Sequence, residues 1–114
     1  MQKARPFIRF LEQTDIPVIA GAFQELGWDK PASQYEHYFV EQTRGVRDVY
    51  IAFVENQFAG YLTIYWNSTY PSFREANIPE IMDFNVLPRF RRQGIGTALM
   101  DKDDLALFLT KNLK

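Results

Sequence analysis

The segment DFNVLPRFRRQGIGTALM, residues 83–100, constrains the fold of this chain more than any other. It starts with an apolar run typical of a β-strand, and Pro88 closes that run because proline cannot continue a strand's hydrogen-bond ladder. Helical spacing starts at about residue 94, just where two glycines flank a single isoleucine. The segment therefore predicts a strand over 80–87 that turns abruptly into a helix.

The turn between this strand and helix has the chemistry of an anion site. The first N–H groups of a helix lack partners within the helix and carry the positive end of its dipole. Gly94 and Gly96 leave the backbone open to a close approach, and Arg89, Arg91 and Arg92 add positive charge. A phosphate or pyrophosphate suits such a turn. A glycine-rich turn with solvated arginines is the alternative, and neither a dinucleotide fingerprint nor a Walker A loop is present.

The remaining patterns predict a small domain with both strands and helices. Alternating and β-branched runs predict strands, helical spacing between caps and glycines predicts helices, and Gly60 indicates a bulge or a close approach inside the second hairpin strand. The predicted elements are a strand at 7–12, helices at 14–28 and 33–45, a hairpin at 49–66 and a long loop at 67–79. This order over one domain, residues 1–114, indicates an α/β or α+β fold with helices on both sheet faces.

Composition excludes several classes of function. The net charge of −1 gives no general attraction to nucleic acid or to an anionic membrane. The chain has no cysteine, which excludes disulfides, thiolate nucleophiles and sulfur-bound metals, and its single histidine, His37, predicts no metal site. Residues 1–15 lack the apolar run of a signal peptide, and no stretch approaches a membrane span, so we expect a cytoplasmic protein.

Residues 83–100 resemble the acetyl-coenzyme A motif of the GNAT N-acetyltransferases, in which a strand reading x-V-x-P precedes R/Q-x-x-G-x-G/A at a helix start. The run DVYIAFVENQFAGYLTIYW is similar to the central hairpin of that family. The resemblance implies a GNAT-like acyl-CoA N-acyltransferase fold, with a mixed, mostly antiparallel sheet flanked by helices. It also implies acetyl-CoA (coenzyme A) as the cofactor.

The same resemblance assigns the cofactor contacts. The backbone of Val86, two residues before Pro88, would contact the pantetheine arm and the thioester carbonyl. The backbone N–H groups of the following turn would hold the pyrophosphate, with the arginines as electrostatic support. These turn residues are Arg91, Arg92, Gln93, Gly94, Ile95, Gly96 and Thr97.

The implied reaction is direct attack by a primary amine of a small molecule or peptide, which calls for a base at neutral pH. The strand offers Glu80 and Asp83, and Glu80 ranks first because some family members place their base six residues before the valine. Strict alternation puts Glu80 on the face of Met82, Phe84 and Val86, and Asp83 on the other, unless a bulge intervenes. The alternative is that both carboxylates bind the neighbouring loop.

The acceptor would lie over residues 65–79 and the first two helices. Four aromatic residues either form an apolar wall for the acceptor or pack within the loop: Tyr65, Trp66, Tyr70 and Phe73. The sequence therefore does not identify the acceptor.

The C-terminal part of the domain differs from the family pattern. The family continues with further elements and a tyrosine that protonates the leaving thiolate, whereas no tyrosine follows Tyr70 here. We therefore expect a domain truncated at its C-terminal end, with an uncovered edge strand that favours a homodimer. The alternative to an active enzyme is an impaired remnant that binds coenzyme A or only dimerises.

Overall fold

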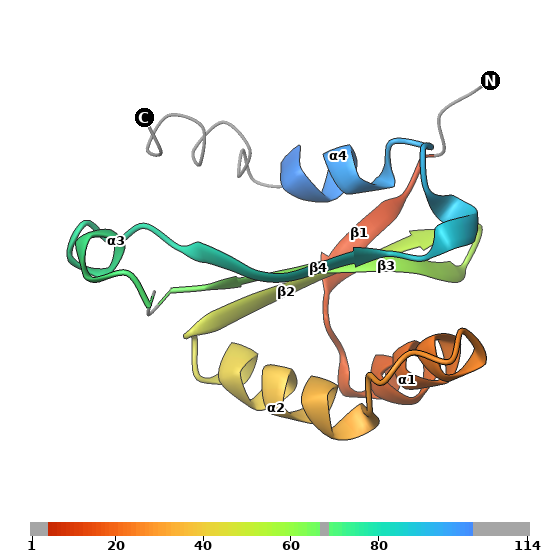
Figure 1. Ribbon diagram of the computed structural model, residues 1–114, viewed down its shortest axis with the longest axis horizontal. Helices are drawn as coiled ribbons and strands as arrows, with labels where there is room; N and C mark the ends of the chain where they lie inside the picture. Colours follow the sequence, from red (N-terminus) through yellow and green to blue (C-terminus); the bar gives the residue numbers. More distant parts are fainter. Residues whose placement is uncertain (1–4, 67–68, 102–114) are drawn as a thin grey trace.

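The computed structural model describes residues 5–66 and 69–101, and its four strands form one antiparallel sheet in the order β1-β2-β3-β4. Helices α1 (Ile16–Glu25) and α2 (Ala32–Thr43) cover one face of the sheet, and α4 (Ile95–Asp101) covers the other (Figure 1). The predicted α/β class, with helices on both faces, is confirmed. The strands are β1 (Phe7–Phe10), β2 (Arg47–Val54), β3 (Gln57–Tyr65) and β4 (Glu80–Val86).

The core lies on both sides of β2 and β3, where side chains with almost no solvent exposure meet the helices. Phe23 of α1 and Tyr35 of α2 pack on Tyr61 from one face, while Ile95 and Leu99 of α4 pack from the other. Of the aromatic stripe predicted on the second helix, Tyr35 is core, and Tyr38 and Phe39 are partly buried and pack against the core. Among the described residues, no helix has the length and apolar character needed to cross a bilayer.

The start of α1 differs from the predicted helix at 14–28. A 3-10 turn, η1 (Gln13–Asp15), comes first, and α1 begins at Ile16. Asp15 does not cap α1 with its side chain. Its carboxylate instead accepts the Glu12 N–H at 2.8 Å and pairs with the Arg9 guanidinium at 2.7 and 2.8 Å, which fastens β1 to the helix start.

The hairpin of β2 and β3 matches the prediction. Its turn residues, Glu55 and Asn56, have φ values of 50° and 66°, the left-handed pair that a two-residue hairpin with right-handed twist requires. The ladder shifts register between Ala52 and Phe53, next to Gly60. A Cβ on Gly60 would lie 2.6 Å from the Asn85 carbonyl oxygen, so this glycine lets β4 approach β3. Both predicted roles of Gly60 are present.

A bulge in β4 overturns the predicted side-chain faces. Asp83 pairs with Thr63, but Ile81 pairs with Ile64 and Glu80 with Tyr65, so Met82 is the extra residue. Thr63 and Tyr65 are two residues apart in β3 and share a face. Glu80 and Asp83 therefore lie on the same face, the one covered by α1 and α2. Strict alternation was wrong here because the inserted residue reverses it.

The segment predicted as a loop at 67–79 contains a short helix, α3 (Pro71–Glu75), so that prediction was incomplete. Pro71 occupies the first turn of α3, where its missing N–H costs no hydrogen bond. Tyr70 and Phe73 meet with ring centroids 5.4 Å apart. Tyr65 and Trp66 lie elsewhere: the Tyr65 ring faces Arg47 at 5.0 Å, and the Trp66 indole N–H donates to Asp48 at 3.1 Å.

Candidate functional site

The end of β4 turns sharply toward α4. The last ladder bond runs from the Leu87 N–H to the Ala59 carbonyl at 2.8 Å, and Pro88 then opens a 3-10 turn, η2 (Pro88–Phe90). The chain reverses through Arg92 and Gly94, whose φ values are 63° and 84°. The first bond of the new helix runs from the Ala98 N–H to the Gly94 carbonyl at 2.9 Å. The N–H groups of residues 95–97 thus precede the first helical bond.

A pocket of about 240 Å³ opens at this turn. It lies between the end of β4 and the start of α4, and its lining includes two arginines and the backbone at the start of the helix. Seven of the eight cofactor residues expected from the sequence line it, together with Phe90: Val86, Arg91, Arg92, Gly94, Ile95, Gly96 and Thr97. This donor set fits the pyrophosphate of coenzyme A, because unpaired helical N–H groups and guanidinium groups both bind phosphate.

Gln93 is the eighth of these residues and has a different role. Its side-chain amide donates to the Arg89 carbonyl at 3.1 Å, which closes the turn on itself. Gly96 also serves packing: a Cβ there would lie 3.2 Å from Cζ of Phe84 and 3.9 Å from Cγ2 of Val86. The second glycine therefore lets α4 pack closely on β4, a reason that the motif alone does not reveal.

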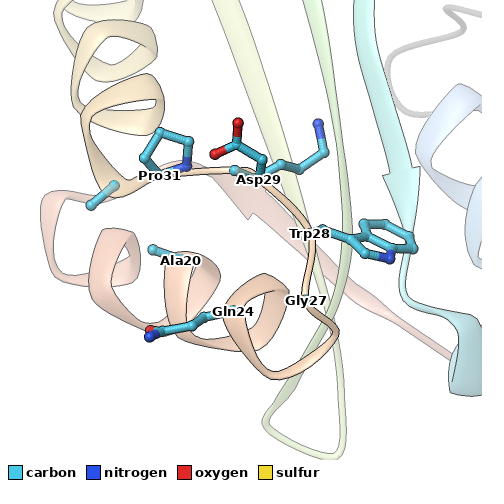
Figure 2. Close-up of a pocket in the computed structure, with 8 residues that line it drawn as sticks. Ala20, Gln24, Gly27, Trp28, Asp29 and Pro31 are labelled. Carbon is cyan, nitrogen blue, oxygen red and sulfur yellow. The ribbon is translucent and has the colours of Figure 1, made fainter.

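Arg91 connects the turn to β4 and to the loop between α1 and α2. Its Nε donates to the Val86 carbonyl at 2.9 Å, and its Cζ lies 5.8 Å from the centre of the Trp28 ring. Figure 2 shows Trp28 turned toward the strand, away from Ala20 and Gln24. A pocket of about 380 Å³ lies along this loop, lined by Ala20, Gln24 and residues 27–32.

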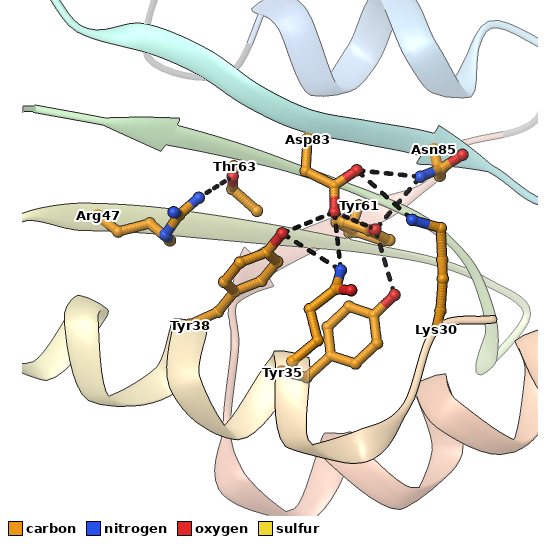
Figure 3. Close-up of polar contacts among 9 residues, drawn as sticks. Lys30, Tyr35, Tyr38, Arg47, Tyr61, Thr63, Asp83 and Asn85 are labelled. Atoms are coloured by element: carbon orange, nitrogen blue, oxygen red, sulfur yellow. Dashed lines mark hydrogen bonds and ion pairs between the residues drawn. The ribbon is translucent and has the colours of Figure 1, made fainter. Parts of the chain in front are cut away.

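Asp83 is the centre of a polar cluster between β4 and α2 (Figure 3). Its Oδ2 accepts hydrogen bonds from Tyr61 at 2.6 Å, Tyr38 at 2.9 Å and the Gln34 amide at 3.1 Å. Its Oδ1 accepts one from the Asn85 amide at 3.1 Å. The Lys30 ammonium lies 3.8 Å from the same Oδ1. The carboxylate is thus bound by two strands, one helix and the loop before it.

Three tyrosines extend this cluster into the core. Tyr35 donates to the Tyr61 hydroxyl at 3.2 Å, and burial raises the pKa of Tyr35 to about 12. Burial, followed by the hydrogen bond to Asp83, raises the pKa of Tyr38 and of Tyr61 well above the usual tyrosine range. All three hydroxyls therefore stay protonated at neutral pH and act as donors.

The sequence did not predict this cluster. Tyr35 and Tyr38 have the spacing of core residues, and no local pattern connects them to a carboxylate 45 or more positions later. The Lys30–Asp83 contact also depends on the fold alone.

Glu80 lies at the opposite end of β4, next to the loop before α3. Its Oε1 accepts hydrogen bonds from the Thr69 N–H at 3.0 Å and the Thr69 hydroxyl at 2.9 Å. Glu80 therefore binds the neighbouring loop, as the alternative interpretation expected. Glu80 and Asp83 share a sheet face but contact different groups.

Comparison with known proteins identifies the family of this chain. The family model described as Acetyltransferase (GNAT) family matches residues 16–102. No curated protein sequence matches the chain.

Three solved structures illustrate the fold. The chain is 19% identical to a ribosomal-protein-alanine N-acetyltransferase from Brucella melitensis biovar Abortus 2308, with a TM-score of 0.64, covering 96% of this chain and 74% of that one. A predicted acetyltransferase with acetyl-CoA from Clostridium acetobutylicum is 17% identical, with a TM-score of 0.63 and coverage of 96% and 76%. An N-acetyltransferase from Thermoplasma acidophilum in complex with coenzyme A is 12% identical, with a TM-score of 0.62 and coverage of 94% and 74%.

At these identities the solved structures establish the shared fold. The family model matches most of the chain, including all of β4, the turn after it and α4. The chain belongs to the acetyltransferase (GNAT) family.

Proposed function

We propose that this protein transfers an acetyl group from acetyl-CoA to a primary amine of a small molecule or peptide. The observation that carries the proposal is the pocket at the end of β4, which combines the Val86 backbone with Arg91, Arg92 and the start of α4. When bound, acetyl-CoA supplies the acetyl group as a reactive thioester. The structures with acetyl-CoA and with coenzyme A among the similar folds support the choice of cofactor.

In this proposal the turn after β4 binds the cofactor through fixed donors. The N–H groups of Ile95, Gly96 and Thr97 would hold the pyrophosphate, and Arg92 would add positive charge. Arg91 holds the Val86 carbonyl through Nε, which fixes the end of β4 beside the pantetheine arm.

Glu80 and Asp83 have different roles toward the acceptor amine: Asp83 binds its ammonium group, and Glu80 acts as the base. Oδ2 of Asp83 accepts three short hydrogen bonds, whereas Oδ1 accepts one and has the Lys30 ammonium 3.8 Å away, so Oδ1 is the oxygen that an acceptor ammonium would bind in place of Lys30. Glu80 accepts two hydrogen bonds from Thr69 at Oε1, and we assign it the role of base. The similarity to a ribosomal-protein-alanine N-acetyltransferase makes a peptide that begins with alanine the first acceptor to try.

Two measurements test this function in sequence. Calorimetry with acetyl-CoA should give saturable binding that Arg92→Ala weakens about tenfold, the effect of one charge-assisted phosphate contact. Thiol release over a panel of primary amines and alanine-first peptides should then identify an acceptor. Binding without release for every amine would indicate a coenzyme A-binding protein, and no binding at all would reject the proposal.

The homodimer and the cytoplasmic location expected from the sequence stay predictions. Light scattering tests the first, and a strictly monomeric species contradicts it.

A further inference from the structure

Lys30 holds a primary ammonium at the carboxylate proposed to bind the acceptor. Its Nζ lies 3.8 Å from Asp83 Oδ1 and 5.9 Å from the centre of the Phe23 ring, and its side chain is 22% exposed. Figure 3 shows Lys30 rising from the loop before α2 toward Asp83 and Asn85. It is the sole lysine in the described ranges 5–66 and 69–101.

The contact between Lys30 and Asp83 is suited to exchange. A charge-assisted hydrogen bond between an ammonium and a carboxylate is about 2.7–2.9 Å long. At 3.8 Å the pair is attracted by charge but holds no short hydrogen bond, and a partly exposed pair of this kind is weak. The short bonds of Asp83 come from Tyr61 and Tyr38, on the other oxygen. An incoming ammonium can therefore replace Lys30 without breaking the cluster.

We propose that Lys30 occupies the position of the acceptor ammonium and that its Nζ is itself acetylated when no acceptor is present. This inference rests on the proposed function. Asp83 and Val86 are three residues apart in β4, about 10 Å along an extended strand. The flexible four-carbon stem of lysine lets Nζ leave Asp83 and move along this edge. A tethered amine reacts at a high effective concentration once Nζ reaches the acetyl carbon in a suitable orientation.

The step balances as an ordinary amide formation. A bond forms between Lys30 Nζ and the acetyl carbon of the thioester, and the carbon–sulfur bond breaks, with its electron pair leaving on sulfur. The ammonium gives up two protons, one to that sulfur and one to solvent. The product is a neutral amide, which no longer pairs with Asp83.

The first test maps acetylation by peptide mass spectrometry after the full chain is incubated with acetyl-CoA and no amine. The other lysines of the sequence, Lys3, Lys102, Lys111 and Lys114, report the chemical background in the same sample. We expect Lys30 to react at least tenfold faster than any of them, with a rate that saturates with acetyl-CoA and does not depend on protein concentration. Equal rates at all five lysines, or a rate proportional to protein concentration, would overturn the inference.

The second test needs no acetyl-CoA. Lys30→Met vacates Asp83 while keeping the length of the side chain, so n-butylammonium should bind at least fivefold more tightly in calorimetry than to the wild type. Lys30→Arg keeps the cation and should bind n-butylammonium as the wild type does. Equal affinity of the Met variant and the wild type contradicts the shared position.

Calorimetry with acetyl-CoA distinguishes a failure of this inference from a failure of the proposed function. Normal binding of acetyl-CoA together with background acetylation of Lys30 rejects this inference alone. Absence of acetyl-CoA binding rejects the proposed function, and the acetylation of Lys30 with it.

Discussion

The Tyr61 hydroxyl donates a hydrogen bond of 2.6 Å to Asp83 Oδ2, across the strand pair β3 and β4. Tyr61 is completely buried, and its hydroxyl also accepts bonds from Tyr35 and Asn85, both at 3.2 Å. The orientation of Asp83 is therefore fixed from inside the core. We therefore expect substitutions among these core residues to affect the candidate site through the position of the Asp83 carboxylate.

Tyr61→Phe should lower the free energy of unfolding by about 1–3 kcal/mol, because it leaves the buried Tyr35 hydroxyl without its acceptor and Asp83 without its shortest bond. Urea unfolding followed by circular dichroism measures the loss. Tyr65→Phe is the matched control, since the Tyr65 hydroxyl makes no hydrogen bond to the described residues and should change stability by less than about 0.5 kcal/mol. Equal losses in the two variants would contradict a structural role for the 2.6 Å bond.

Alkaline unfolding should follow from the same tyrosines. The pKa of Tyr35 is raised to about 12 in the fold, and those of Tyr38 and Tyr61 are raised further. The stabilising effect is complete below the unfolded-state pKa of about 10 and is lost as pH rises through the folded value. Absorbance at 295 nm should show these three of the six tyrosines ionising only together with unfolding. A stepwise titration of all six in the folded protein would contradict this.

Gly60→Ala should displace β4 from β3. The added Cβ would lie 2.6 Å from the Asn85 carbonyl oxygen and 3.0 Å from the Val86 Cα, and both are backbone atoms with little freedom to move. We expect a loss of about 1–3 kcal/mol in urea unfolding, together with weaker acetyl-CoA binding. Gly21→Ala is the control, because nothing lies within 4 Å of its Cβ, and alanine should stabilise helix α1 by about 0.5–1 kcal/mol. A neutral Gly60→Ala would show that β4 can shift without consequence.

The sequence predicted most of the fold because its signals are local. Residues 49–66 contain two β-branched and aromatic runs on either side of a turn, and Pro88 and Gly94 mark the ends of elements that the structure contains. The turn between β4 and α4, which we propose binds the cofactor, was predictable as a turn for the same reason, because its residues are consecutive.

The other half of the site depends on distant contacts. Asp83 meets Tyr38 and Gln34 only because side chains of α2 reach β4 across the sheet face, and no spacing in the sequence encodes that contact. The sheet face of Glu80 was predicted wrongly because the bulge at Met82 adds one residue to β4. A prediction from strict alternation assumes a regular strand, so it cannot locate a bulge.

Asp15→Asn should make the free energy of unfolding less dependent on pH in the acidic range. Burial alone would raise the pKa of Asp15, but hydrogen bonds from Arg9 and from the Glu12 N–H, with the charge of Arg9, lower it. A lowered pKa stabilises the fold above the unfolded-state value of about 3.9, and this contribution is lost as pH falls through the folded value.

At pH 7 the asparagine variant should lose about 1.5–3 kcal/mol, the range for hydrogen bonds to charged groups, and the loss should shrink as pH falls below the unfolded-state pKa of about 3.9. Asp29→Asn is the control, because Asp29 is exposed and pairs with none of the described residues. Urea unfolding at pH 7, 4 and 2.5 measures both variants, and a loss that stays constant with pH would contradict the ion pair.

Glu80→Gln should separate the role of base from the role of loop anchor. The glutamine oxygen can still accept both bonds from Thr69, so the loop and the thermal midpoint should stay near those of the wild type. The amide cannot take up a proton, and kcat for an identified amine should fall at least about 100-fold, the usual contribution of a general base. The pH profile of kcat should change as well. Glu75→Gln, on exposed α3, should leave kcat unchanged. Unaltered kcat of Glu80→Gln from pH 6 to 9 would assign Glu80 to the loop alone, and the base to another group.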